Sequence, residues 1–473
     1  MKKNFLSVLL IFTTVFAFAQ TPCNNGEAGG YECNGYDLMA HIPLSVFNTT
    51  GANDSWGWTD PDDGKEYVLM GLENGTAFID ISDPVNPIYL GKLPTATGTT
   101  VWRDIKTYNN YAFIVSEASG HGMQIFDLTH LRNVNNPPVT FTEDAHYSGF
   151  SDAHNIVINE NTGYAYAVGT NTFGGGAHFV NIQDPLNPVA AGGFSADGYT
   201  HDAQVVTYIG PDADYVGSEI YIGSNGSGQI ISIVDVTNKS NPQGISTLSY
   251  SNSGYTHQGW FTEDHRFFLL GDEFDESNVG FNTRTIVFDL TDLDNPVLSY
   301  EYFGVTPAID HNGYVKGDNY YLSNYAAGLR VLDISDIEND NIVEIGFFDT
   351  YQDNNDASYN GVWNVYPYFE SENIMINDRS GGFFLVRSSL LNNNDFSAVN
   401  TFVVYPNPAS DELTIKSNGD VISSISIVDV VGKVLFAESD LNSEIKNIDI
   451  SSFSAGIYFV NINNNLTKKV IKK

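Results

Sequence analysis

The sequence predicts an all-β protein, a seven-bladed β-propeller of four-stranded antiparallel blades followed by a small C-terminal β-sandwich. One short phrase recurs six times: an apolar run, an acidic residue or its amide, and usually a proline-marked turn. The copies are spaced by 47, 54, 54, 54 and 44 residues, a period that suits a blade of four strands. Helical periodicity is absent, and short β-branched and aromatic runs alternate with Gly, Asn, Asp and Pro. The anchor residues of the copies are Asp80, Asp127, Asn181, Asp235, Asp289 and Asp333.

Each repeat is expected to supply four strands. In 201–250, four strand-like runs are separated by Gly-, Asn- and Pro-containing turns. A degraded seventh copy at 381–391 completes the count, and closure into a ring would leave only short sheet edges. The predicted units are 55–98, 104–143, 154–196, 201–250, 257–303, 311–349 and 361–391, which together place the propeller at 51–396.

One part of the N-terminal region is predicted to be cleaved off as a signal peptide, and the part that follows is predicted to be held by a disulfide. Residues 1–19 have the basic start, apolar middle and small-residue end of a secretory signal peptide. No later stretch is long and apolar enough to span a bilayer. Cys23 and Cys33 are expected to form a disulfide in an oxidising compartment, since no metal-ligand spacing surrounds them. Residues 20–50 would form this stapled segment, and 38–47 would supply the outer strand that the seventh blade lacks.

The charge balance excludes several partners. The formal net charge is −36, so a nucleic-acid partner and anionic membranes are disfavoured. An acidic surface with few lysines is compatible with divalent cation sites.

The sequence changes character after Asn400. The segment YPNPA begins at Tyr405, an Asp429–Gly432 turn follows, and Gly456-Ile457-Tyr458 precedes terminal lysines. With these features, residues 403–473, after a linker at 397–402, resemble the type A C-terminal sorting domain of the type IX secretion system of Bacteroidetes. The resemblance implies contact with that secretion machinery and a protein that is extracellular or attached to the outer cell surface.

A second resemblance covers 21–396. It rests on GLRVLDISD at 328–336, SIVDVTNKSNP at 232–242, GYTHDAQV at 198–205 and GYTHQGWFTEDHRFFLLGDE at 254–273. These segments resemble the choice-of-anchor B family, whose repeats are called LVIVD repeats. The resemblance implies a secreted or surface-anchored propeller and no particular biochemical activity.

Four histidines share one register of the repeats. They stand at the start of the first strand of their units, which in a propeller is innermost, so they should meet at one mouth of the central channel. In the other three units, Trp56, Asp104 and Asn360 are expected near the same place. The four histidines are His154, His201, His257 and His311.

Acidic loops after each second strand should emerge at the same mouth. Imidazole and carboxylate together suit one divalent cation, Ca, Mn or Zn, at the propeller axis. The alternative is structural: each histidine would bond to a neighbouring loop and fix the spacing of the blades. The candidate ligands for a metal or another ligand are His154, His201, His257, His311, Asp104, Asp272, Glu273 and Asp378.

Three functions follow from these patterns. The favoured one is a non-catalytic surface module for binding or adhesion to an extracellular protein or glycan, because no complete catalytic set can be named. The alternative is a metal-dependent extracellular lyase or hydrolase acting on a polysaccharide, with Glu117 or Glu273 as general base. The third is a purely structural metal that locks the ring. The fold alone does not choose among them.

Overall fold

The computed structural model describes residues 20–389, 402–407, 409–417, 421–429, 433–439, 441–463 and 466–473. The chain divides into two compact units, Met1–Ser388 and Ser389–Lys473. The predicted signal peptide and almost all of the predicted linker at 397–402 lie outside the described residues. Within the described residues, no helix has the length and apolar character needed to cross a membrane.

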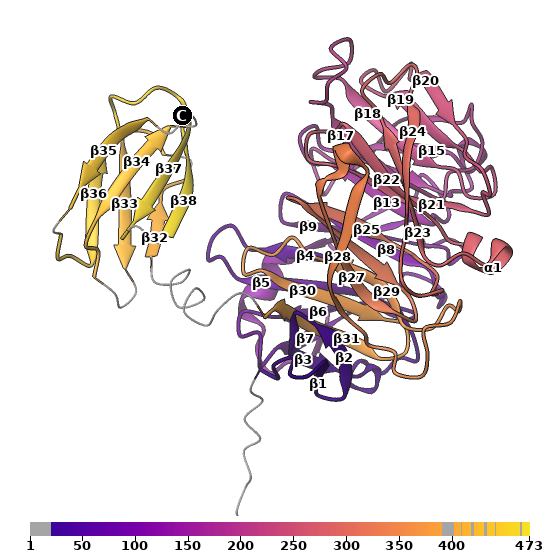
Figure 1. Ribbon diagram of the computed structural model, residues 1–473, viewed down its shortest axis with the longest axis horizontal. Coiled ribbons are helices and arrows are strands. Elements are labelled where there is room, and N and C mark those ends of the chain that lie inside the picture. Colours follow the sequence, from indigo (N-terminus) through magenta and orange to yellow (C-terminus); the bar gives the residue numbers. More distant parts are fainter. Residues whose placement is uncertain are drawn as a thin grey trace, which may run out of the picture. The chain divides into compact units, whose positions relative to one another are not determined.

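The first unit consists of mostly antiparallel sheets, most of them four-stranded and formed by strands consecutive in the chain (Figure 1). Short β-branched and aromatic runs fold as strands here because alternate side chains pack between neighbouring sheets. The strands, sheet by sheet, are β4 (Ala52–Thr59), β5 (Glu66–Leu72), β6 (Gly75–Asp80) and β7 (Ile88–Pro94); β8 (Arg103–Tyr108), β9 (Tyr111–Ser116), β10 (Met123–Asp127) and β12 (Ala145–Tyr147); β13 (Asn155–Asn159), β14 (Tyr164–Val168), β15 (Ala177–Asn181) and β16 (Val189–Phe194); β17 (Asp202–Thr207), β18 (Glu219–Ser224), β19 (Ile231–Asp235) and β20 (Gln243–Leu248); β21 (Thr256–Phe261), β22 (Phe267–Asp272), β23 (Arg284–Asp289) and β24 (Val297–Phe303); β25 (Gly313–Lys316), β26 (Asn319–Asn324), β27 (Gly328–Asp336) and β28 (Asn341–Phe348); and β29 (Val362–Tyr366), β30 (Asn373–Asp378) and β31 (Gly382–Ser388).

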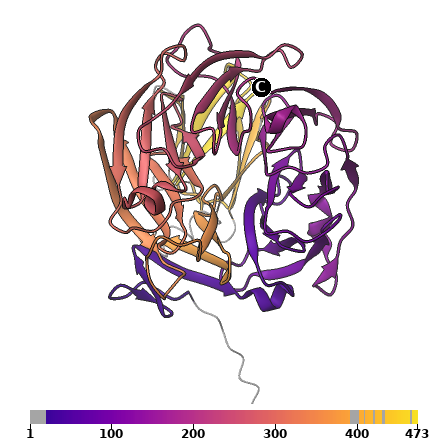
Figure 2. The ribbon, with the colours of Figure 1, turned by 90° about the vertical axis from the view of Figure 1, so that its right-hand side faces the viewer.

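These sheets stand around a common centre, as Figure 2 shows. Their first strands contact one another in the order β4, β8, β13, β17, β21, β25 and β29, and β29 contacts β4 in turn. The hydrophobic core lies between adjacent sheets; Trp58, Leu69 and Phe78 of one sheet, for example, pack against Ile105 and Phe126 of the next. These inner strands therefore line one axis, and this places the residues at their starts close together.

Additional short strands extend three of the sheets. β3 (Tyr36–Ile42) pairs with β31 at the outer edge of the sheet that begins with β29. β1 (Glu27–Ala28) and β2 (Tyr31–Asn34) extend the sheet of β28, and β11 (Val139–Thr140) runs parallel to β7. The repeat pattern did not predict the pairing of β1, β2 or β11.

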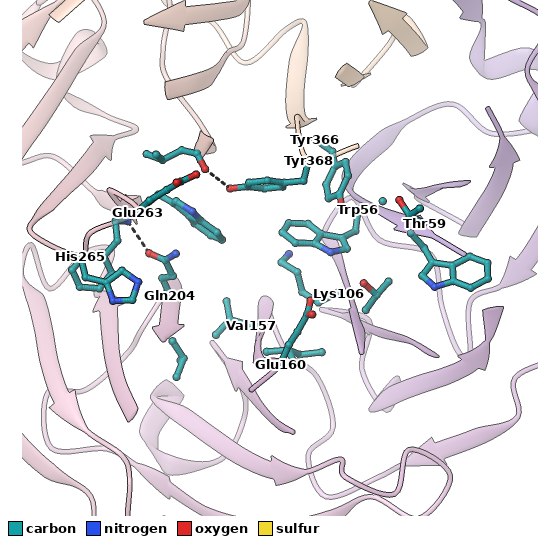
Figure 3. A pocket seen from close by; sticks show the side chains of 18 of the residues that line it. Trp56, Thr59, Lys106, Val157, Glu160, Gln204, Glu263, His265, Tyr366 and Tyr368 are labelled. Carbon is teal, nitrogen blue, oxygen red and sulfur yellow. Dashed lines mark hydrogen bonds between the residues drawn. The ribbon is translucent and has the colours of Figure 1, made fainter. Parts of the chain in front are cut away.

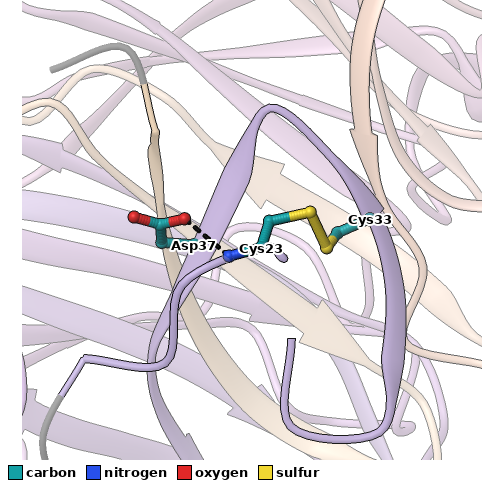
Figure 4. The surroundings of a disulfide bond; sticks show 3 residues. All are labelled: Cys23, Cys33 and Asp37. Atoms are coloured by element: carbon teal, nitrogen blue, oxygen red, sulfur yellow. Dashed lines mark hydrogen bonds between the residues drawn. A yellow bond between two sulfur atoms is a disulfide. The ribbon is translucent and has the colours of Figure 1, made fainter. Parts of the chain in front are cut away.

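The predicted disulfide is confirmed. Cys23 and Cys33 are bonded, and the backbone N–H of Cys23 donates to Oδ1 of Asp37 at 2.8 Å (Figure 4). The bond closes a short loop between the start of the described chain and β2. It ties this segment beside the strand β3 that begins at Tyr36.

The repeated anchor residues have one structural role in all six copies. Five of them end the third strand of their sheet, and Asp333 lies within β27. Each accepts, through its side-chain Oδ1, a hydrogen bond from the backbone N–H two residues further on, at 2.8–3.0 Å. This Asx turn bends the chain out of the strand. The repeated phrase therefore builds the scaffold.

Helical structure in the described residues is short. It comprises α1 (Asp275–Val279) and the 3₁₀ turns η1 (Leu44–Phe47), η2 (Leu128–Asn133), η3 (Phe173–Gly175) and η4 (Ile337–Asn339). α1 follows β22 directly and lies beside the loop that carries Glu273.

The second unit is also built of antiparallel strands. One sheet contains β32 (Phe402–Tyr405), β33 (Glu412–Ser417) and β36 (Ile445–Asp449). The other contains β35 (Val434–Glu438), β34 (Ile425–Asp429), β37 (Gly456–Ile462) and β38 (Leu466–Lys472). Residues from both sheets, among them Leu413, Ile427 and Val460, share one buried cluster.

Candidate metal centre

The four histidines of the repeat register form a continuous arc of imidazoles. The ring centroids of His154 and His201 are 4.1 Å apart, those of His201 and His257 4.6 Å, and those of His257 and His311 4.3 Å. Each residue lies at or just before the start of an inner strand, so the closure of the sheets around one axis brings them together. His201, His257 and His311 are buried, and His154 is partly exposed.

One carboxylate joins the buried end of this arc. Oε2 of Glu273 is 3.8 Å from Nε2 of His257, and Oε1 is 3.9 Å from Nε2 of His311. The three ligand atoms lie within 4.8 Å of one another. An ion bound tetrahedrally at about 2.0–2.1 Å places its ligand atoms roughly 3.3 Å apart. Small side-chain movements would therefore bring these three atoms to coordinating distance.

Hydrogen bonds on the far side of the imidazoles orient the rings. Nδ1–H of His311 donates to the backbone carbonyl of Trp363 at 2.6 Å, which leaves the lone pair on Nε2, the atom that faces Glu273. Histidines that bind metals are usually held in this way by a carbonyl or carboxylate. At the other end of the arc, Nδ1 of His154 is 2.6 Å from Oε1 of Glu117. His257 lacks such a bond: its Nδ1 is buried and has no hydrogen-bond partner among the described residues.

Burial keeps the central imidazoles neutral. Desolvation, and then the neighbouring imidazoles, lowers the pKa of His201 and His257 well below the usual value. Desolvation lowers the pKa of His311 to about 3, although the bond to Trp363 opposes the shift. The nitrogen lone pairs are therefore available at neutral pH, as metal binding requires.

The same environment raises the pKa of Glu273 to about 7. Desolvation is the main cause, and a 2.9 Å hydrogen bond from the Tyr325 hydroxyl opposes it. A cation would stabilise the ionised carboxylate, so cation binding should release a proton near neutral pH.

Tyrosine hydroxyls complete the surroundings of the arc. Tyr255 places its hydroxyl 2.9 Å from Nδ1 of His201, and Tyr199 places its hydroxyl 3.4 Å from the same atom. Both tyrosines occur in a Tyr-Thr-His segment, two residues before His201 and His257. This repeated tripeptide was the sequence signal that could have identified them.

The other carboxylates proposed from the sequence have different surroundings. Asp104 lies in β8 and bonds to the ammonium of Lys106 at 2.6 Å. Asp272 accepts hydrogen bonds from the Tyr250 hydroxyl and from the backbone N–H groups of Gly254, Tyr255 and Phe274, which lie just before β21 and just after β22. Asp378 accepts from Thr350 and from the N–H groups of residues 380 and 381. These contacts organise the ring and its loops.

Two expected positions are corrected. Trp56 was expected beside the histidines, but β4 already begins at Ala52, so Asp54 reaches the imidazole cavity and Trp56 lines a different cavity further along the strand. Asn360 precedes β29, and the residue that reaches the imidazoles from this sheet is Trp363, whose ring centroid is 4.8 Å from that of His311. Both expected positions were wrong because the inner strands are short and of unequal length, so different repeats reach the axis with residues at different places in the strand.

From β8, Arg103 also reaches the imidazole cavity. It is buried, and its guanidinium donates to the carbonyl of Leu72 and bonds Nε2 of His121 at 3.0 Å. It lines the same small cavity as the imidazoles.

Comparison with known proteins supports the two-part organisation. Residues 403–473 match the family of secretion system C-terminal sorting domains, which confirms the predicted sorting domain of the type IX system. No curated protein sequence matches the chain. The structure is similar to hydrazine synthase of Kuenenia stuttgartiensis, with a TM-score of 0.52 and 10% identity over 74% of this chain and 98% of that chain. It is also similar to the Cps50 (Swd1) β-propeller domain of Myceliophteria thermophila, with a TM-score of 0.47 and 11% identity over 75% and 99%.

These similarities define a class of protein. The first unit is an all-β, propeller-like assembly of mostly four-stranded antiparallel sheets, and an identity of 10% carries the argument no further than the fold. The sorting domain shows that the chain is secreted or attached to the outer cell surface through the type IX machinery.

Proposed function

We propose that residues 51–396 form a seven-bladed propeller of the LVIVD-repeat, choice-of-anchor B type, and that it acts outside the cell as a binding or adhesion module. The six Asx-turn copies and the closed order of the inner strands support this architecture. The stapled segment 20–50 completes the ring through β3, and residues 403–473 form the sandwich that is used in export.

The module holds one divalent cation at the imidazole end of its axis. The convergence of Nε2 of His257, Nε2 of His311 and the carboxylate of Glu273 within 4.8 Å carries this proposal. Two imidazole nitrogens and one carboxylate suit Zn²⁺ or Mn²⁺ better than Ca²⁺, which prefers oxygen ligands. The cation would lock two neighbouring sheets together, those of β21 and β25, and order the loops at this end, where a partner could bind.

The test is calorimetric titration of the metal-stripped mature chain with Zn²⁺ and with Mn²⁺. We expect one ion per chain and at least a tenfold loss of affinity in Glu273→Gln, which removes the only anionic ligand of the three. Glu117→Gln is the matched control, because Glu117 contacts His154 at the other end of the arc; it should change the affinity less than threefold. Equal affinities in all three proteins would overturn the cation site.

A second assay separates binding from catalysis. The metal-loaded protein is incubated with neutral and acidic polysaccharides, and new chain ends are measured. We expect no release of product. Release that disappears in Glu273→Gln would replace the binding module by the lyase or hydrolase alternative.

A further inference from the structure

A second cavity lies on the same axis, further along the inner strands than the imidazoles. Three inner strands show the relation: β4 gives Asp54 to the imidazole cavity and Trp56 to the second cavity, β21 gives His257 and Trp260, and β29 gives Trp363 and Tyr366. The offset of two to three residues corresponds to roughly 7–10 Å along a strand. The second cavity has a volume of about 640 Å³, within the usual range of roughly 300–1,000 Å³ for ligand sites.

Aromatic side chains form its walls. Trp56 and Trp260 are partly exposed, and both contact the buried ring of Tyr314 edge to face, at centroid distances of 5.9 and 5.0 Å. Tyr366 contacts Trp56 at 5.1 Å, and the hydroxyl of Tyr368 donates to the carbonyl of Val315 at 3.0 Å. These contacts fix the rings before any ligand arrives, and Figure 3 shows Trp56, Tyr366 and Tyr368 gathered at the cavity. Rigid, partly exposed rings offer apolar faces at low cost in conformational entropy.

Polar groups stand among these rings. Glu160 and Glu263 are exposed to the cavity, and the backbone N–H of Gly317 holds Glu263 through Oε1 at 2.7 Å. Lys106 closes the inner end, with its ammonium 4.6 Å from the centroid of the Trp56 ring and 2.6 Å from Asp104 (Figure 3). The cavity therefore combines apolar faces, carboxylate acceptors and one ammonium donor.

The charged groups that line the cavity limit which class of ligand it can bind. An organic cation would find aromatic faces here, but the Lys106 ammonium already occupies the Trp56 face and would repel it. An anion would meet Glu160 and Glu263 in a protein with a net charge of −36. A neutral ligand with hydroxyl groups and an apolar face satisfies all of these groups.

We propose that this aromatic cavity binds a neutral carbohydrate, with a sugar face against Trp260 and hydroxyl groups bonded to Glu160 and Glu263. The site is separate from the imidazole end, because the buried pair of Lys106 and Asp104 lies between them. It does not depend on the proposed cation.

The experiment probes the metal-free mature chain with an array of neutral gluco-, manno-, galacto- and xylo-oligosaccharides, followed by titration in solution. Three of the five tryptophans line this cavity, so a bound sugar should change the intrinsic fluorescence. We expect binding of at least one series, weakened tenfold or more in Trp260→Ala and in Glu160→Ala. Trp102→Ala, which removes an exposed indole at the other end, should bind within twofold of the parent.

Glu160→Ala separates a loss of binding from a loss of folding. Its side chain is exposed, so its removal should leave the thermal unfolding midpoint unchanged. Absence of binding across the array would overturn the proposal. Unchanged sugar affinity in both Trp260→Ala and Glu160→Ala would also overturn it. Choline is included as a cationic probe, and tight binding of choline without binding of any sugar would overturn the proposal as well.

Discussion

Replacing Lys106 by Met tests whether the centre of the ring is held by an ion pair. The ammonium of Lys106 lies 2.6 Å from Oδ1 of Asp104, and the two side chains are 10% and 2% exposed. Burial lowers the pKa of Lys106, but Asp104, Asp54 and Asp202 raise it more, so its net shift is upward. The ammonium of Lys106 therefore supplies positive charge to a cluster of three buried carboxyl groups.

The magnitude follows from what the substitution leaves behind. Asp104 would keep its hydrogen bonds from the N–H groups of Ile105 and Ile156, at 2.6 and 2.8 Å, but would lose its cation. Breaking a buried pair by removing one partner costs about 3–5 kcal/mol, whereas replacing both partners is often close to neutral. We therefore expect Lys106→Met to lose about 3–5 kcal/mol, and the double variant Lys106→Met/Asp104→Asn to recover at least about 2 kcal/mol of it.

The assay is urea unfolding followed by tryptophan fluorescence. All five tryptophans precede residue 389, so the signal reports the first unit without a contribution from the sorting domain. A loss below about 1 kcal/mol in Lys106→Met would refute the reasoning. So would a double variant no more stable than the single one, because the cost would then not come from an unpaired carboxylate.

Three further predictions concern other parts of the chain. Changing Cys23 and Cys33 to Ser should lower the stability of the first unit by roughly 3 kcal/mol in the same assay, since the bond closes a loop with a sequence separation of 10; a loss under 1 kcal/mol would contradict this. His121 is buried beside Arg103, and burial and that guanidinium lower its pKa to about 4, so the unfolded chain binds the proton more tightly. Compared with His121→Gln, the parent should lose about 3 kcal/mol as the pH falls from 6.5 to 4 and nothing between pH 7 and 8; a pH-independent difference would be inconsistent with the shift. Deletion of 403–473 should leave the protein inside the outer membrane of a host with type IX secretion, as measured by fractionation, and continued export would contradict the assignment of the sorting domain.

The sequence predicted the parts of the fold that repeat. The anchor residues from Asp80 to Asp333 recur because each repeat needs the same Asx turn, and the local signal is strong enough to be read without a structure. The strand that completes the last sheet was expected at 38–47, and the structure has β3 at Tyr36–Ile42. The pairing of β1, β2 and β11 has no such signal, because two to four residues at a sheet edge are placed by tertiary contacts.

The candidate site was predictable only in part. The register of the four histidines was visible because each precedes or begins an inner strand, and ring closure then makes them neighbours. Sequence could not separate Glu273, which faces two imidazoles, from the adjacent Asp272, which turns to Tyr250 and backbone N–H groups. Adjacent residues point in different directions, and the loop conformation decides which of them faces the axis. The aromatic cavity was missed because its residues follow the histidines at unequal spacings.

The most direct test of the central claim is an anomalous difference map from crystals of the mature chain grown with Zn²⁺ or Mn²⁺. We predict one strong peak within about 2.0–2.3 Å of Nε2 of His257, Nε2 of His311 and the carboxylate of Glu273. A map with no peak among these three side chains, with the imidazole arc otherwise intact, would contradict the proposed metal centre.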